Sequence, residues 1–150
     1  MPVSPAFAES NRSQTERLRK LVRRLDPSML AVRLPNGWTV AGSLAHVAFW
    51  DRQRLCLMQR WAAGDFRSGA YDGDVFNAAL QPLLEMIPAE RAAAAAVQAA
   101  EEVDAFLLEV SDEVVEAALA RPDAPNLDRG SHREGHLDRA EQALAEAGYR

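Results

Sequence analysis

Apolar residues recur three and four positions apart through most of this chain, and this spacing is the period of an α-helix. In residues 4–25 the apolar stripe consists of Leu18, Leu21, Val22 and Leu25. No segment shows the alternation of apolar and polar residues that is typical of a half-buried β-strand. Alanine is abundant and aromatic residues make up only 7% of the chain, which also favours helix over sheet. The sequence therefore predicts an all-α protein.

Caps and breakers divide the chain into four main helices. We expect these helices over residues 4–25, 39–62, 88–110 and 128–147. Ser4 before Pro5 and, in the second helix, Thr39 are the expected N-terminal caps, and Gly148 suits the end of the last helix. A loop over residues 64–73 and a shorter helix capped by Asp74 make a long connection between helices 2 and 3. The pattern predicts one domain, residues 1–150, folded as a four-helix bundle.

The charge is uneven along the chain. The net charge is −5, which argues against general binding to nucleic acid. Residues 1–75 carry 11 basic and 7 acidic side chains, whereas residues 76–150 carry 6 and 15. This asymmetry indicates either a basic face for an anionic ligand or two solvated helix faces that complement each other, and we favour the second interpretation.

Cys56 is the only cysteine, so the chain forms no internal disulfide. It lies between Leu55 and Leu57 in an apolar helical stretch, where we expect a buried and unreactive thiol. No apolar run is long enough to span a membrane, and the first residues do not resemble a signal peptide. We therefore expect a cytoplasmic protein that binds neither membranes nor nucleic acid.

The three histidines are the strongest candidates for chemistry. His132 and His136 are four positions apart on one predicted helix, so both rings face one side of it, and Ala140 continues that side toward the core. His46 lies about 10 Å into the second predicted helix, level with the other two rings if both helices start at the same end of the bundle. Three neutral imidazoles suit zinc or nickel and leave a position open for water or substrate, while ligand type alone leaves copper and iron open.

Two interpretations of the histidines remain at this point: one shared divalent metal ion, or three satisfied core residues. Glu134 follows His132 by two positions, about 200° round the helix. It therefore cannot act as the base of a metalloprotease, whose motif places glutamate directly after the first histidine.

Three further residues are candidates for a pocket beside the histidines. Trp50 lies one turn after the first histidine and either lines the pocket or belongs to the core. Asp51 and Asn77 are candidates for orienting a substrate or a metal-ligating side chain. For Asp51 we favour a structural role, paired with an arginine such as Arg54 or Arg133.

Several segments, in their order along the chain, resemble the DinB-like superfamily of bacterial helical-bundle proteins. They are the first helix with its loop, residues 18–34; a tryptophan-then-histidine opening of the second helix, residues 36–51; a segment before the third helix, residues 71–78; and a closing HxxxH helix, residues 130–137. The resemblance covers nearly the whole chain. It implies a DinB/YfiT-like four-helix bundle, metal ligands at His46, His132 and His136, and a homodimer.

Members of that superfamily include thiol S-transferases, a mycothiol-dependent maleylpyruvate isomerase, proposed hydrolases and self-protection proteins. The resemblance therefore implies a metal-dependent enzyme that activates a low-molecular-weight thiol or water and acts on a small molecule, as a transferase or a hydrolase. The alternatives are a non-catalytic module that captures a reactive small molecule, with a structural metal or none, and a purely structural bundle.

Overall fold

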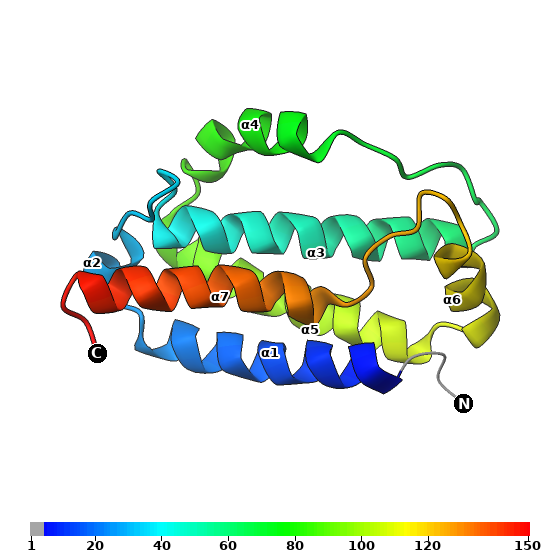
Figure 1. Cartoon of the computed structure of the whole chain (residues 1–150), viewed down its shortest axis with the longest axis horizontal. Helices are drawn as coiled ribbons and strands as arrows, with labels where there is room; N and C mark the ends of the chain where they lie inside the picture. The colour runs from blue at the N-terminus through cyan, green and yellow to red at the C-terminus, as the bar shows by residue number, and fades with distance from the viewer. Residues whose placement is uncertain (1–4) are drawn as a thin grey trace.

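The computed structural model describes residues 5–150 and consists of helices joined by short and long connections (Figure 1). The helices are α1 (Pro5–Arg24), α2 (Pro27–Leu30), α3 (Val40–Ala62), α4 (Gly73–Leu84), α5 (Ala89–Glu109), α6 (Asp112–Leu119) and α7 (Arg129–Glu146). Within residues 5–150 there is no β-sheet, only an isolated bridge between Arg33 and Thr39. The predicted all-α class is confirmed, while the predicted cap at Ser4 lies outside the described residues.

Side chains that accept hydrogen bonds mark the starts of several helices. Thr39 caps α3 and Asp128 caps α7, each accepting from an amide of the first turn at 2.9 Å. The short helix α4 begins earlier than predicted, because Asp72 rather than Asp74 accepts the amide hydrogen bond of its first turn. Gly148, with φ of +93°, follows the end of α7 in the left-handed conformation that glycine adopts readily.

The four long helices α1, α3, α5 and α7 pack along one another (Figure 1). α1 and α3 each contact both α5 and α7, and α3 also contacts α2, α4 and α6, so α3 is the central helix. The first halves of α3 and α5 share one apolar cluster and their second halves share another, so these two helices run parallel. Parallel neighbours need a connection as long as a helix. Residues 63–88 provide the expected long connection, which lies along α3 rather than across one end.

α3 and α7 run in opposite directions, so the condition under which the sequence would place the three rings level, a common start of both helices, is not met. His136 lies beside Ser43 near the start of α3, at 3.5 Å, whereas Arg129 contacts Asp51, two turns further along α3. Residues 120–128 run beside the second half of α3 before α7 begins (Figure 1). The first turns of α7 therefore meet the middle of α3, and this offset brings the histidines together despite the reversed direction.

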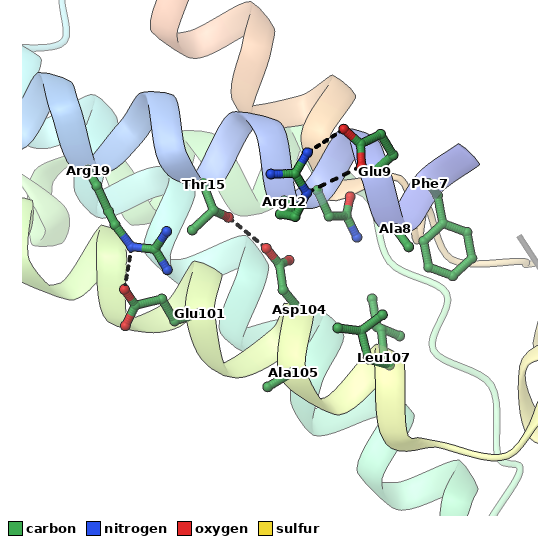
Figure 2. A pocket seen from close by; sticks show the side chains of 12 residues that line it. Phe7, Ala8, Glu9, Arg12, Thr15, Arg19, Glu101, Asp104, Ala105 and Leu107 are labelled. Carbon is green, nitrogen blue, oxygen red and sulfur yellow. Dashed lines mark hydrogen bonds and ion pairs between the residues drawn. The ribbon is translucent and has the colours of Figure 1, made fainter. Parts of the chain in front are cut away.

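A group of buried charges joins all four long helices. Asp51 of α3 is fully buried and accepts hydrogen bonds from Nε of Arg129 (2.8 Å) and Nε of Arg133 (2.9 Å), both on α7. Arg133 also pairs with Asp104 of α5 (2.8 Å) and donates to Thr15 of α1 (2.9 Å). Thr15 in turn donates to Asp104 at 2.6 Å (Figure 2). The favoured structural role of Asp51 is thus observed, with Arg133 and a second arginine as its partners.

Surface ion pairs connect the basic first half of the chain with the acidic second half. Arg17 of α1 contacts Asp138 (2.7 Å) and Glu141 (2.9 Å) of α7, and Arg19 contacts Glu101 of α5 at 2.7 Å. The favoured interpretation of the charge asymmetry, complementary faces of neighbouring helices, is therefore confirmed.

Cys56 is exposed, so the prediction of a buried thiol is wrong. It belongs to a stripe on α3, with Arg52 and Gln59, that faces solvent while the rest of the helix is largely buried. The apolar neighbours in sequence, Leu55 and Leu57, point to other sides of the helix and do not cover the thiol. Although α3 is rich in apolar residues, none of the described helices has the length and apolarity needed to cross a membrane.

The buried charge group predicts a large effect for one substitution. Asp51→Asn leaves Arg129 and Arg133 buried without their shared carboxylate, and we expect the free energy of unfolding to fall by about 3–5 kcal/mol. Urea denaturation of the metal-free protein measures this change. The control is Glu9→Gln, which removes an exposed, solvent-screened ion pair with Arg12 and should leave the stability nearly unchanged. Similar losses for the two variants would contradict the role given to Asp51.

Candidate metal centre

The three histidines of the chain meet at one place in the structure. One ring nitrogen from each of His46, His132 and His136 lies within 4.8 Å of the other two. The ring centroid of His46 is 5.7 Å from that of His132 and 4.6 Å from that of His136, and the two α7 rings are 4.7 Å apart. His46 is buried and the other two are partly buried. The structure thus brings together all three residues predicted as metal ligands.

The start of α7 is held against α1, and this contact fixes where its histidines point. A β-carbon at Gly130 would lie 2.1 Å from Oγ of Ser10, so only glycine permits this approach of the two helices. Asn11 of α1 is buried, accepts a hydrogen bond from the amide of Gly130 (2.7 Å) and donates to the carbonyl of Leu127 (3.1 Å). Together with the ion pairs of Asp51, these bonds set both the position and the rotation of α7.

Two arginines on α7 donate hydrogen bonds to its histidine rings. Nη2 of Arg129 donates to Nδ1 of His132 (3.0 Å), and Nη2 of Arg139 donates to Nδ1 of His136 (3.2 Å). Both arginines are three positions from the histidine they contact, a helical spacing that the sequence analysis overlooked. Nδ1 of His46 is buried and has no hydrogen-bond partner within the described chain. Buried polar atoms without a partner are uncommon in proteins, and a metal ion would supply one here.

Burial lowers the pKa of all three histidines. The pKa is lowered to about 4 for His46, to about 2 for His132 and to about 3 for His136. The positive charge of Arg129 lowers each of these pKa values further, because it opposes a second positive charge nearby. The imidazoles are therefore neutral at pH 7, and neutral imidazole is the form that binds a metal ion.

The histidines border a cavity of about 290 Å³. It is lined by Asn36, Trp38, Ser43, His46, Asn77, His132 and His136. Among the three predicted pocket residues, Asn77 is in this lining. Trp50 is not, but its Nε1 donates to Oδ1 of Asn77 (2.9 Å) and so holds the amide in place. Asp51 does not reach the cavity, because Arg129 and Arg133 enclose its carboxylate.

Three residues of the lining, Asn36, Trp38 and Ser43, were not predicted from the sequence. Ser43 lies three positions before His46, on the same face of α3, and its Oγ is 3.5 Å from Nδ1 of His136. Its spacing was a signal that could have identified it. The ring of Trp38 meets His46 edge-on with centroids 5.4 Å apart. Trp38 precedes α3 in a turn, where no helical spacing relates it to the histidines.

A larger groove, of about 450 Å³, lies between α1 and α5 (Figure 2). Its lining includes the apolar side chains of Phe7 and Leu107, and the ion pair of Arg19 with Glu101 also borders it (Figure 2). Within residues 5–150, the three histidines are the only group of three or more His, Cys, Asp or Glu side chains with the spacing of metal ligands. The histidine cavity is therefore the better candidate for a chemical site.

The arrangement fits one divalent cation. Zinc binds imidazole nitrogen at about 2.0–2.1 Å, so two nitrogens on a tetrahedral zinc ion lie about 3.3–3.4 Å apart. The ring nitrogens lie within 4.8 Å of one another in the structure and would have to draw closer around an ion. The unpartnered Nδ1 of His46 and the adjoining cavity also suit such a site. His132 and His136 would bind an ion only with the Nδ1 bonds to Arg129 and Arg139 rearranged, because a neutral ring that accepts at Nδ1 carries its proton on Nε2. Comparisons of the chain with protein families, curated proteins and solved structures find no match.

The lowered pKa values predict how the stability of the metal-free protein depends on pH. In the unfolded chain the three histidines take up protons below their ordinary pKa of about 6.5, whereas in the folded protein they stay neutral. The unfolding free energy is therefore at its full value above this pH. It falls as the pH falls, because protons bind the histidines of the unfolded chain but not those of the folded protein. At pH 5.5 we expect a loss of about 1.4 kcal/mol for each histidine, measured by urea denaturation in a chelator.

A variant in which His46, His132 and His136 are all glutamine provides the control for this pH dependence. Glutamine does not titrate, so its unfolding free energy should change much less between pH 7.5 and pH 5.5. Parallel profiles for the variant and the wild type would show that the histidines are not buried in the neutral form.

Proposed function

We propose that this protein binds one divalent metal ion, zinc or nickel, through His46, His132 and His136. The observation that carries the proposal is that all three histidines of the chain, from two helices distant in sequence, converge beside a cavity. Three histidines that served only as separate core residues would not need to lie next to one another. The closed ring of contacts among α1, α3, α5 and α7 also supports assigning the fold to the DinB-like four-helix bundles that the sequence resembles.

We further propose that the site is catalytic and acts on a small molecule. A divalent ion held by three imidazoles lowers the pKa of a water or thiol that takes its open position, and so supplies a nucleophile near neutral pH. The guanidinium groups of Arg129 and Arg139 favour negative charge beside the rings. Since Oδ1 of Asn77 accepts the indole hydrogen of Trp50, the amide N–H groups of Asn77 are left to donate to a substrate oxygen in the cavity.

The nucleophile comes from solution in this proposal. Cys56, the only thiol of the chain, is outside the lining of the histidine cavity, on the exposed stripe of α3. Glu134 is exposed on α7 and also outside the lining. Water or a low-molecular-weight thiol therefore fits the site better than a side chain of the protein does. The choice of a thiol, the transferase or hydrolase type and a homodimer follow the resemblance to DinB-like proteins.

Metal content gives the first test. We expect wild-type protein purified without chelator to hold about one zinc or nickel ion per chain by elemental analysis, because three-histidine sites bind these ions tightly. His46→Ala and His132→Ala should each lower this to less than about a tenth, since two imidazoles bind an ion far more weakly. Glu134→Ala, between the two α7 histidines but outside the cavity, is the matched control and should keep its metal. Equal metal content in all four proteins would contradict the site.

Turnover gives the second test. Metal-loaded protein is assayed with low-molecular-weight thiols and a panel of electrophiles, and separately with ester and amide substrates. We expect one of these reactions to be accelerated by the wild type and by Glu134→Ala, and to fall to the uncatalysed rate with His46→Ala. Equal rates for wild type and His46→Ala would reject catalysis at the histidines. Full metal content without turnover of any substrate would favour the non-catalytic capture of a small molecule.

A further inference from the structure

Arg54 is a buried arginine of α3 that has no acidic partner. Its side chain donates from Nη2 to the hydroxyl of Tyr71 (2.7 Å) and from Nη1 to Oε1 of Gln53. Its Nε is buried and makes no hydrogen bond, and Arg54 forms no ion pair with any described residue. An arginine side chain keeps its positive charge in proteins, and a buried charge is costly unless an opposite charge compensates it. Arg54 therefore lacks a carboxylate to compensate its buried positive charge.

The charges near Arg54 leave one positive charge in excess. Arg54, Arg129 and Arg133 are three buried guanidinium groups, whereas Asp51 and Asp104 are two carboxylates, both bonded to Arg129 or Arg133. A third carboxylate nearby, Asp123, is neutralised by its own arginine, Arg121. Burial lowers the pKa of Arg129, and the charge of Arg54 lowers it further, so the two arginines are close enough to repel. The excess charge resides on Arg54, because Arg54 has no carboxylate of its own.

Arg54 borders a second cavity, of about 350 Å³, which is distinct from the histidine cavity. Leu57, Pro125 and other small apolar groups form much of its wall. The single carboxylate in the lining, Asp123, is already bonded to Arg121 (2.8 Å) and to the hydroxyl of Ser68 (2.7 Å). The cavity thus combines apolar walls with one uncompensated positive charge.

Tyr71 supplies a second donor in the same cavity. Its hydroxyl oxygen accepts the hydrogen bond of Arg54, so its own O–H is left to donate. Its ring stacks on Trp50 with centroids 4.8 Å apart, and the guanidinium of Arg54 lies 5.8 Å from the Trp50 ring centroid. These contacts hold both donors in place before any ligand binds.

We propose that this cavity binds the carboxylate of a small organic acid. The guanidinium of Arg54 and the hydroxyl of Tyr71 donate to the carboxylate oxygens, and the carbon part of the acid contacts Leu57 and Pro125. A carboxylate matches one guanidinium and one hydroxyl. Phosphate or sulfate, with more oxygens and a higher charge, would need donors and charges that this lining does not contain.

The carboxylate site does not depend on the metal. Trp50 contacts the wall of each cavity, bonding to Asn77 on the histidine side and stacking on Tyr71 on the other. Arg54 is eight residues after His46 in α3, which places it about 12 Å further along the helix. Binding of the acid can therefore be measured on metal-free protein. Only the further idea that the bound acid is the substrate rests on the proposed function.

NMR titration of metal-free, ¹⁵N-labelled protein tests the proposal. The Nε–Hε signal of Arg54 is identified by its absence from Arg54→Gln, and propionate and benzoate are titrated at constant ionic strength alongside their neutral amides and sulfate. We expect a saturable shift of this signal with a carboxylate, none with the amides, and sulfate binding at least about tenfold weaker. Tyr71→Phe should weaken binding about fivefold to tenfold, because it removes one hydrogen bond and keeps the ring.

A matched control is Arg52→Gln, which removes a positive charge from the exposed face of α3, where Arg52 pairs with Glu102, and should leave binding unchanged. The proposal would be overturned if neither carboxylate gives a saturable shift, or if sulfate binds more tightly than the carboxylates. It would also be overturned if Arg54→Gln, followed by its backbone amide signals, binds a carboxylate as tightly as the wild type. If Arg54→Gln does not fold, the comparison of Tyr71→Phe with Arg52→Gln decides. Because no metal is present, failure here leaves the metal-content test untouched, and the reverse also holds.

Discussion

The structure depends on one buried carboxylate, that of Asp51 in the middle of α3. It binds two arginines of α7, and Arg133 extends the network to Asp104 of α5 and Thr15 of α1, so a single group of bonds reaches all four long helices. Such buried ion pairs add little net stability over apolar packing, but they penalise every arrangement that leaves a charge unpaired. The network therefore specifies how α7 is placed along α3, and that placement brings two histidines of α7 to the one histidine of α3.

The network itself is balanced, with two arginines and two aspartates, but Arg129 also brings a positive charge to the histidines. Arg129 is bonded both to Asp51 and to the ring of His132. Burial lowers the pKa of that ring, and the charge of Arg129 lowers it further. Arg54, one turn after Trp50, adds a positive charge without a carboxylate. A metal ion at the histidines would add further positive charge. Arg129 and Arg54 thus place positive charge beside both proposed sites, although the protein as a whole has a net charge of −5.

Local patterns predicted much of this structure. The spacing of apolar residues and the cap Thr39 identified the main helices, and the last helix was expected to start at Asp128, which the structure shows to be its cap. These signals act within a few residues, which is why the sequence alone shows them. The spacing of His132 and His136, together with the inward side they share with Ala140, identified the two histidines of α7 correctly as neighbours facing the core side. The offset of α7 along α3 was not predictable, because the path of residues 120–128 and long-range bonds determine it.

Other features were missed because they depend on contacts between distant segments. The exposure of Cys56 depends on which side of α3 other helices cover, and its apolar neighbours gave no sign of this. Arg54 was considered as a partner of Asp51, yet the aspartate is three positions earlier and is enclosed by α7. Only the folded arrangement shows that Arg54 is left without a carboxylate.

X-ray absorption fine structure at the metal edge tests the central claim most directly. On zinc-loaded protein, the account predicts a first shell of three imidazole nitrogens and one further oxygen or nitrogen at about 2.0–2.1 Å. A shell that contains sulfur at about 2.3 Å, or fewer than three imidazoles, would contradict a site built from His46, His132 and His136.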